Sequence, residues 1–325
     1  MLLSRSDVAA LLSLDECIDA VEQAFKAHAE GRSMAPGVLG VHAKDGGFHI
    51  KAAGLELSRP YFAAKVNGNF FHNRERFGLP NIQGLIVLCD AENGSPLAVL
   101  DSIEITILRT GAATAVAAKY LAREDAKTVA ICGCGNQGRV SLRALTRVRH
   151  IEQVYAFDTD HEQAARYAEE LSNELQLAVT AVRDLPEAAG KSDVIITCTP
   201  SKQPFLRQSE VAPGAFIAAV GADNETKQEL DPHLLATSKV VVDSLEQCAA
   251  IGDLKLALQL GLMTRAEVHA ELGEVIAGRK PGRASRDEVI VFDSTGTALQ
   301  DVAAAAIVYE RAVRNGQGFH LDFAG

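Results

Sequence analysis

The sequence has few cysteines, and their spacing does not indicate a disulfide framework or a zinc site. Six cysteines occur in 325 residues, far fewer than in a small disulfide-stabilised protein. They form no Cys-x-x-Cys pair, and no histidine lies at metal-ligand spacing near Cys132 and Cys134. We therefore predict reduced thiols, no metal site and a cytoplasmic protein.

Positive charge is also scarce. The 32 lysines and arginines are outnumbered by 42 aspartates and glutamates, which gives a net charge of −10. Because nucleic-acid binding depends on cations that neutralise phosphates, we expect no nucleic-acid partner. No stretch approaches the roughly 20 apolar residues that span a bilayer. The N-terminal segment is too acidic for a signal peptide, so we expect no membrane association. A few well-placed cations must then hold any anionic substrate.

At roughly 100–200 residues per domain, the length predicts about two domains. The first part of the chain opens with a helix that Ser13 and Glu16 begin as a capping box and that Gly31 ends. Residues 38–99 have the pattern of strands joined by turns, without alternating helices. This predicts a mixed or antiparallel sheet, followed by an Ala-rich helix at 103–121.

From residue 127 onward, short apolar strands alternate with helices. This pattern predicts a parallel sheet covered on both faces, as in a Rossmann-type domain. The Ala-rich helix near the C-terminus resembles helix 103–121, so we expect it to return to the first domain. The predicted fold class is α/β. A Rossmann-type domain at 122–293 is inserted in an α+β substrate-binding and dimerisation domain formed by 1–121 and 294–325.

Residues 133–138 have the pattern G-x-G-x-x-G of a dinucleotide-binding turn. They follow an apolar strand and open a helix, and Asp158 stands 20 residues after Gly138 at the end of the next strand. Gly133 permits the tight turn, Gly135 lets pyrophosphate approach, and Gly138 packs the helix on the strand. Asp158 would bind ribose hydroxyls and repel a 2′-phosphate. NAD(H) is therefore favoured, with NADP(H) as the alternative.

Three cations stand in apolar or Ala-rich surroundings. Lys65 lies in the strand pattern YFAAKVNGNF, on the face of Ala63 and Asn67, and Lys51 lies in FHIKAAG. For Lys65, a side chain whose charged end reaches solvent is an equal alternative to a functional role. Arg109 lies within the Ala-rich helix, where it needs either a carboxylate partner or a bound phosphate or substrate.

Polar residues also follow two of the predicted parallel strands. Asp223 follows the strand AFIAAVG, and Thr197 begins the segment TCTPSKQP, whose hydroxyls would line the nicotinamide side of a cofactor site. Open α/β sheets bind ligands at the carboxyl ends of their strands. For Asp223, a turn-forming or helix-capping role is the alternative.

Taken together, these segments resemble the ornithine cyclodeaminase/μ-crystallin family. The matching segments are KVNGNF, GLPNIQGLIVLCDAENGSPLAVLDS, ITILRTGAATAVAAKYLA, ICGCGNQG, TCTPS, VGADNETKQELDP and FDSTGTALQDVAAAA. They follow the family order across nearly the whole chain. The resemblance implies a dimerising substrate domain around a Rossmann insertion, so we expect a homodimer.

The resemblance also implies roles for individual residues. Lys65 matches the family lysine that contacts substrate, Asp223 matches the catalytic aspartate, and Arg109 matches an arginine that faces the cofactor phosphates and the substrate. With the glycine turn, the predicted cofactor-binding residues are Arg109, Thr110, Gly133, Gly135, Asn136, Gln137, Gly138, Asp158, Thr197, Lys227 and Ser294.

The chain departs from the family at one point. Many members carry an arginine after the proline that corresponds to Pro36, where it holds the substrate carboxylate, but here Gly37 follows. We hypothesise that Lys51 supplies the missing positive charge, as a substrate-binding residue beside Lys65 and Arg109. The departure argues against ornithine as the substrate.

The family exchanges a hydride between a nicotinamide and the α-carbon of an amino acid or imine. The resemblance therefore implies reduction of a cyclic imino acid, 1-pyrroline-2-carboxylate or 1-piperideine-2-carboxylate, to L-proline or L-pipecolate. The cations would hold the carboxylate of a substrate bound between the domains. Asp223 would act as general acid/base, which near neutral pH requires burial to raise its pKa.

Three alternatives stay open. The first is an ornithine cyclodeaminase that recycles NAD and releases ammonia, and the second is a related amino-acid dehydrogenase. The third is an NAD(P)H-dependent binding protein without turnover.

Overall fold

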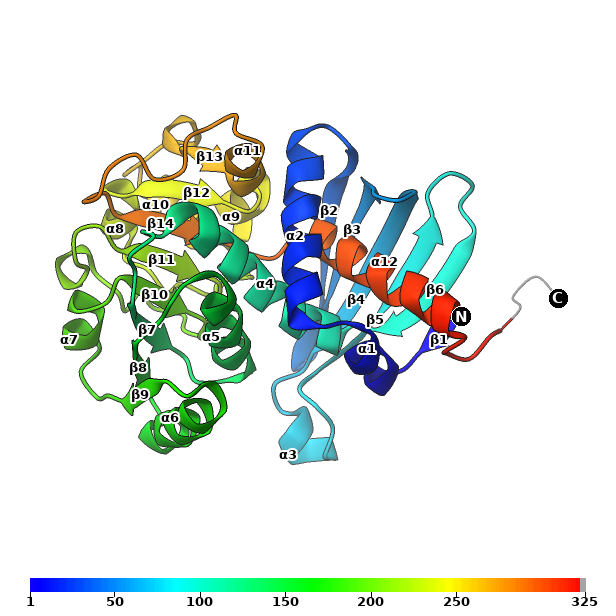
Figure 1. Cartoon of the computed structure of the whole chain (residues 1–325), viewed down its shortest axis with the longest axis horizontal. Helices are drawn as coiled ribbons and strands as arrows, with labels where there is room; N and C mark the ends of the chain where they lie inside the picture. Colours follow the sequence, from blue (N-terminus) through cyan, green and yellow to red (C-terminus); the bar gives the residue numbers. More distant parts are fainter. Residues whose placement is uncertain (322–325) are drawn as a thin grey trace. The chain divides into compact units, whose positions relative to one another are not determined.

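The computed structural model describes residues 1–321. The chain forms two compact units, Met1–Arg109 with the described residues from Thr297 onward, and Thr110–Gly296 (Figure 1). The predicted domain boundaries, 121/122 and 293/294, lie near these divisions without coinciding with them, and they stay predictions. Among the described residues, no helix is both long enough and apolar enough to cross a membrane.

The first unit contains a six-stranded sheet in the order β1-β6-β5-β4-β3-β2. Its strands are β1 (Leu2–Leu3), β2 (Ser33–Ala43), β3 (Gly46–Glu56), β4 (Pro60–Asn69), β5 (Ile82–Asp90) and β6 (Pro96–Asp101). Neighbouring strands pair antiparallel, except that β1 pairs parallel with β6. The prediction of a mixed sheet is therefore confirmed.

Helices cover one face of this sheet. They include α1 (Arg5–Leu11), α2 (Leu14–Ala29) and α12 (Ala298–Asn315), while α3 (Asn73–Phe77) lies between β4 and β5 in the chain. As predicted, Ser13 caps α2 in a capping box with Glu16. The C-terminal helix α12 packs against α2, β3 and β4, so the first unit is built from both ends of the chain (Figure 1).

The two faces of the sheet differ in character. On β4, the side chains of Tyr61, Ala63, Lys65 and Asn67 are buried, whereas Val66 between them is exposed. This alternation follows from the period of two in a strand. It places Lys65 on the covered face with Ala63 and Asn67, as predicted.

The second unit contains an eight-stranded, fully parallel sheet in the order β13-β12-β14-β11-β10-β7-β8-β9. Its strands are β7 (Thr128–Cys132), β8 (Gln153–Phe157), β9 (Ala178–Ala181), β10 (Val194–Thr197), β11 (Phe216–Ala219), β12 (Lys239–Val242), β13 (Ala270–Glu271) and β14 (Ile290–Asp293). This is the predicted Rossmann-type sheet.

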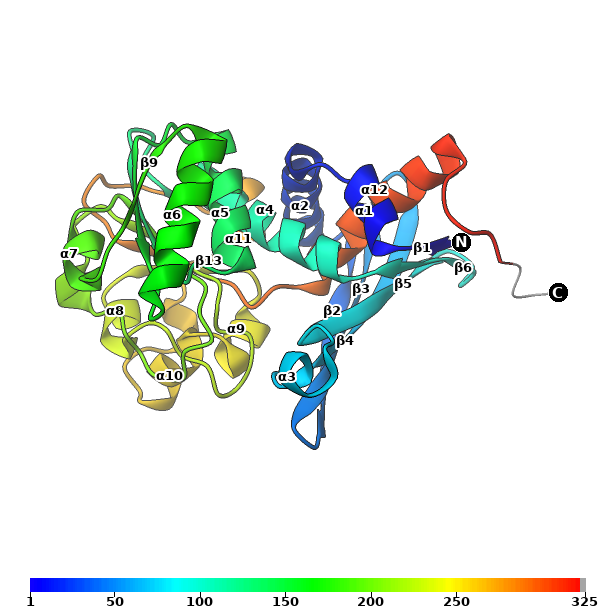
Figure 2. The same cartoon turned by 90° about the horizontal axis from the view of Figure 1, so that it is seen from below.

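Both faces of the parallel sheet are covered by helices. The helices are α5 (Asn136–Val148), α6 (His161–Leu175), α7 (Leu185–Gly190), α8 (Pro232–Ala236), α9 (Leu245–Ile251), α10 (Leu254–Gln259) and α11 (Leu272–Ile276), with short 3₁₀ turns at Gln208–Glu210 and Arg265–Glu267. Apolar residues of α7 to α10 form one core with the strands, while α5 and α6 lie on the opposite face (Figure 2). The apolar strand sequences are explained by this double coverage.

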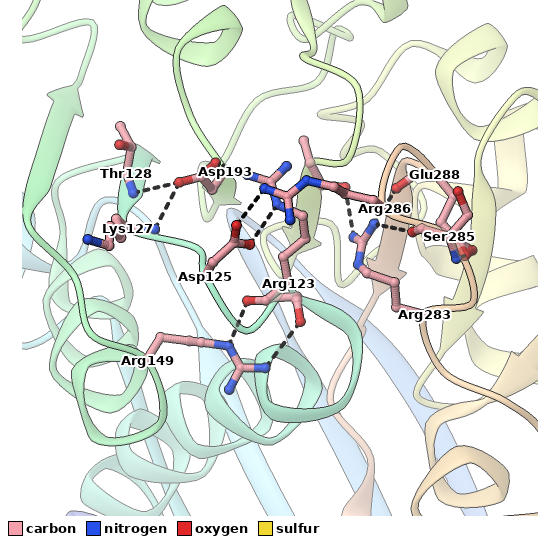
Figure 3. A network of polar contacts seen from close by, with 12 residues as sticks. Arg123, Asp125, Lys127, Thr128, Arg149, Asp193, Arg283, Ser285, Arg286 and Glu288 are labelled. Carbon is pink, nitrogen blue, oxygen red and sulfur yellow. Dashed lines mark hydrogen bonds and ion pairs between the residues drawn. The ribbon is translucent and has the colours of Figure 1, made fainter.

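Helix α4 (Ile103–Leu121) ends in the second unit, where arginines and carboxylates hold its C-terminal end to the sheet (Figure 3). The Arg149 guanidinium donates to four main-chain carbonyls at and just beyond this end, at 2.8–3.1 Å. The last carbonyls of a helix have few or no partners within the helix, so Arg149 supplies additional donors there. Asp193 pairs with Arg123 and accepts the main-chain N–H groups of Lys127 and Thr128 at 2.8 and 3.0 Å. The amino edge of the sheet is thereby fixed to α4.

Candidate functional site

The glycine turn at 133–138 joins β7 to α5 in the second unit. Gly133 has a φ of +102°, and a Cβ there would lie 2.8 Å from the Cys198 carbonyl oxygen. At Gly138, a Cβ would lie 2.2 Å from the Gly133 carbonyl oxygen. The backbone conformation and close packing of the protein itself therefore require both glycines.

Gly135 is different, because no contact within the described part of the chain requires a glycine there. Its backbone is extended, with a φ of −82°, and a Cβ there would meet no atom within 4 Å. Asn136 and Gln137 open α5 just after it, and no side chain caps this helix. An open space before uncapped helical N–H groups fits a phosphate. The predicted dinucleotide turn therefore meets the requirements of a pyrophosphate site.

A hollow of about 890 Å³ lies beside this turn. Its lining residues are Cys132, Gly133, Phe157, Asp158, Thr159, Arg183, Asp184, Leu185, Pro186, Thr199, Pro200, Ser201 and Phe205. The Asp158 carboxylate accepts the main-chain N–H groups of Cys134 and Asp160 and the side-chain amide of Gln163, at 2.9–3.0 Å. Since a carboxylate accepts about four hydrogen bonds, Asp158 has room for about one more, such as a ribose hydroxyl.

Two predicted cofactor-binding hydroxyls have partners within the protein. Thr197 is completely buried, and its hydroxyl donates to Glu229 Oε2 at 2.8 Å. The hydroxyl of Ser294, which is also buried, donates to Asp243 Oδ2 at 2.8 Å. The hollow is instead lined by Thr199, two residues after Thr197 on the same loop.

Asp223 and Lys227 lie on the loop that follows β11. Lys227 Nζ donates to Asp223 Oδ1 at 2.7 Å and to the Gly221 carbonyl oxygen at 3.0 Å. The Asp223 side chain is 45% exposed, so the burial that its predicted role requires is not found. The loop therefore presents a half-exposed carboxylate whose orientation is fixed by an ammonium group.

In the first unit, two buried cations share one buried carboxylate. Lys65 Nζ lies 2.8 Å from both oxygens of Asp301, on α12, and 3.4 Å from Thr106 Oγ1. Arg109 Nε lies 3.4 Å from Asp301 Oδ1, and its Nη1 donates to Gln300 Oε1 at 3.1 Å. Arg109 thus has the carboxylate partner that the sequence analysis considered. Thr110, which follows it, is buried.

Lys51 adds a third positive charge to this group. It stands directly opposite Lys65 in the β3–β4 register and is also buried. Burial lowers the pKa of Lys65 to about 7; Asp301 opposes this shift, while Arg109 and Lys51 reinforce it. An anion that joined the cluster would relieve the repulsion among the cations, and a carboxylate matches their donors.

The sequence analysis missed Asp301. The available signal was an acidic residue within the Ala-rich helix segment LQDVAAAA, which needs a cationic partner if it is buried. Sequence alone did not show that this partner is Lys65, 236 residues away.

Comparison with known proteins gives the family. Residues 1–316 match the model of the ornithine cyclodeaminase/mu-crystallin family. The chain belongs to this family. The predictions of the family, of the α/β fold class and of an oxidoreductase are thereby confirmed.

Several solved structures are similar to this chain over almost its whole length. An archaeal alanine dehydrogenase dimer with bound NAD is 38% identical, with a TM-score of 0.95 and 99% of both chains covered. The Δ1-pyrroline-2-carboxylate reductase of Thermococcus litoralis, in complex with NADH and L-proline, is 35% identical, with a TM-score of 0.93 and 99% and 100% covered. The iminosuccinate reductase of Paracoccus denitrificans, in complex with NAD⁺, is 31% identical, with a TM-score of 0.89 and 99% of both covered.

The glycine turn yields a test of the dinucleotide site. Gly135→Ala places a methyl group in open space, so the melting temperature should stay unchanged, while the dissociation constant of NADH, measured by fluorescence titration, should rise about tenfold. Gly138→Ala is the contrasting variant, because its Cβ meets the main chain, and it should lower the melting temperature. Wild-type NADH affinity in Gly135→Ala would contradict the assignment.

Proposed function

We propose that this chain is an NAD(H)-dependent reductase that converts a cyclic imino acid, 1-pyrroline-2-carboxylate or 1-piperideine-2-carboxylate, to L-proline or L-pipecolate. The observation that carries the proposal is the buried group in which Lys65 and Arg109 share Asp301. Its excess of positive charge suits a small substrate with a carboxylate. The T. litoralis relative, whose complex contains NADH and L-proline, supports both the cofactor and the substrate class.

The nicotinamide cofactor would supply the hydride. Gly135 and the N-terminus of α5 would hold its pyrophosphate, and Asp158 would accept a hydrogen bond from a ribose hydroxyl. The other predicted cofactor contacts, including Lys227 and the segment that contains Ser294, stay proposals.

The Lys65 group would bind and orient the substrate carboxylate. Arg109 offers a planar set of donors, while Lys65 adds a compact ammonium group. Asp301 holds both side chains in place from α12. We assign Lys51 to the same carboxylate. There it would replace the arginine that many family members have at the position of Gly37. Fixing the carboxylate also fixes the imine carbon, which is the orientation effect that hydride transfer needs.

Asp223 is assigned to the proton on the imine nitrogen. A carboxylate accepts a hydrogen bond from a protonated imine, and the protonated form is the better hydride acceptor. Lys227 holds one oxygen of Asp223 at 2.7 Å and so fixes the direction of the other. In this assignment Asp223 acts as a charged acceptor, consistent with its half-exposed position.

A second candidate is an amino-acid dehydrogenase that acts on an open-chain substrate. The similarity to an archaeal alanine dehydrogenase, at 38% identity over 99% of the chain, favours it. Both activities need one site for a carboxylate and one for an imine. The Lys65 group and the Asp223–Lys227 pair therefore fit either activity.

Substrate turnover distinguishes these activities. With 1-pyrroline-2-carboxylate we expect one NADH oxidised per L-proline formed, followed by absorbance, and much slower oxidation with pyruvate and ammonium. Lys65→Met should lower kcat/KM about 100-fold, because it removes a buried partner of the substrate carboxylate. The matched control is Lys119→Met, at an exposed lysine, which should leave kcat/KM unchanged.

Other outcomes would replace the proposal. Faster turnover of pyruvate with ammonium would assign an alanine dehydrogenase activity. Conversion of ornithine without net NADH change would assign a cyclodeaminase, and tight NADH binding without any turnover would assign a binding protein.

We also propose a homodimer that forms through the uncovered face of the first sheet. Phe48, Val66 and Leu85 are 42%, 39% and 54% exposed and border an apolar hollow of about 670 Å³ with Phe77 and Leu79. A contiguous apolar surface of this kind marks an interface. The alanine dehydrogenase relative, which is described as a dimer, supports a second copy as the occupant.

The oligomeric state tests this interface. Leu85→Glu should give a monomer in light scattering at concentrations where the wild-type protein is a dimer, because it buries a charge in an apolar contact. Leu260→Glu, at an equally exposed leucine (58%) of the second unit, should stay dimeric. A dimeric Leu85→Glu protein would place the interface elsewhere.

A further inference from the structure

Glu229 is a completely buried carboxylate that no predicted role uses. It follows the loop that carries Asp223 and Lys227, and its side chain turns back to the start of that loop. It lies at the carboxyl edge of the parallel sheet, where β10 and β11 end.

The carboxylate joins two loops. Glu229 Oε1 accepts the main-chain N–H and the hydroxyl of Thr199, at 2.6 and 2.7 Å. Oε2 accepts the Thr197 hydroxyl at 2.8 Å and the main-chain N–H of Gly221 at 2.9 Å. These four hydrogen bonds fill the capacity of a carboxylate, and all four donors are uncharged.

Glu229 is itself held firmly. Asp253 Oδ1 accepts the main-chain N–H groups of Glu229 and Leu230, at 2.7 and 2.8 Å. The main chain on either side of the carboxylate therefore cannot shift without breaking further buried hydrogen bonds, each of which is costly to leave unmade.

The two loops joined by Glu229 have different roles. Thr199 lines the hollow beside the glycine turn. Gly221 stands two residues before Asp223. A Cβ at Gly221 would lie 2.5 Å from both carboxylate oxygens of Glu229, so glycine is needed there for the contact to form.

We propose that Glu229 is a positioning residue, whose buried carboxylate fixes the Asp223 loop against the wall of the nucleotide hollow. Asp223 would thereby be held in a set position relative to the bound cofactor. The inference rests on the proposed function, which assigns Asp223 to the imine nitrogen.

Glu229→Gln tests this role with little change of shape. The amide group offers one acceptor oxygen, so either Thr199 or Gly221 loses the acceptor for its main-chain N–H. The Thr199 contact is shorter, at 2.6 Å against 2.9 Å, so we expect the oxygen to stay there and the amide nitrogen to face Gly221. The contact with Thr199 in the wall of the hollow is then preserved, whereas the Asp223 loop loses the acceptor for the Gly221 main-chain N–H.

We expect kcat in Glu229→Gln to fall at least about tenfold, with the dissociation constant of NADH within about threefold of wild type. Hydrogen exchange, followed by mass spectrometry, should accelerate in the peptide that contains Gly221. The matched control is Asp193→Asn, the same change of acid to amide at the opposite edge of the sheet. It should lower the melting temperature and leave kcat unchanged.

Where Asp223→Asn lowers kcat, a wild-type kcat in folded Glu229→Gln overturns the proposal, whatever the exchange rates show. An equal loss of kcat in Asp193→Asn also overturns it, because the effect would then be one of stability. If Glu229→Gln does not fold, Gly221→Ala replaces it, because the added Cβ displaces the Glu229 carboxylate. The same measurements of kcat, NADH affinity and hydrogen exchange then test the proposal. Asp223→Asn distinguishes failure of the proposed function from failure of this inference. Wild-type kcat in Asp223→Asn refutes the proposed role of Asp223. Hydrogen exchange at Gly221 in Glu229→Gln then still tests the Glu229 contact.

Discussion

The first unit depends on one shared carboxylate. Asp301 lies 2.8 Å from Lys65 Nζ and 3.4 Å from Arg109 Nε, and all three side chains are buried. Charges in a protein interior are costly unless they are paired, and one carboxylate cannot fully compensate two cations. Burial lowers the pKa of Lys65 to about 7, and the nearby charges of Arg109 and Lys51 reinforce this shift. Because Asp301 comes from α12, the C-terminal helix must pack on the N-terminal sheet for this group to exist. In the proposed function, this charge imbalance favours the binding of a further anion, the substrate carboxylate.

In the second unit, buried carboxylates stabilise loops instead of pairing with buried cations. Parallel strands end at one edge of the sheet, so the glycine turn, Asp158, Thr199 and Asp223 all follow strands at that edge. The irregular loops there leave main-chain N–H groups without partners in the sheet. Buried carboxylates such as Glu229 accept these groups. These loops are thereby ordered by side chains rather than by secondary structure.

Local patterns predicted the elements whose causes are local. The capping box at Ser13, the alternation around Lys65 and the parallel sheet follow from neighbouring residues, and the structure has all three. The helices α8 to α11 were not foreseen, because five to seven residues are too few to show a helical period. Nor could sequence find the partners of Lys65 or show that the Thr197 hydroxyl is taken by Glu229, because these contacts depend on tertiary packing. The glycine turn was predictable because its G-x-G-x-x-G pattern lies directly between an apolar strand and a helix.

Proton uptake on anion binding tests the central claim most directly. With a pKa lowered to about 7, Lys65 is largely neutral at pH 8 in the free protein and protonated at pH 6. A bound carboxylate favours the charged ammonium, so 2-furoate, which is ionised at both values, should bind with uptake of nearly one proton at pH 8 and almost none at pH 6. Calorimetric titration of the NADH complex in buffers of different ionisation enthalpy measures this number, and Lys65→Met should abolish the uptake. Binding of 2-furoate at pH 8 without proton uptake, or with the same uptake in Lys65→Met, would contradict the account.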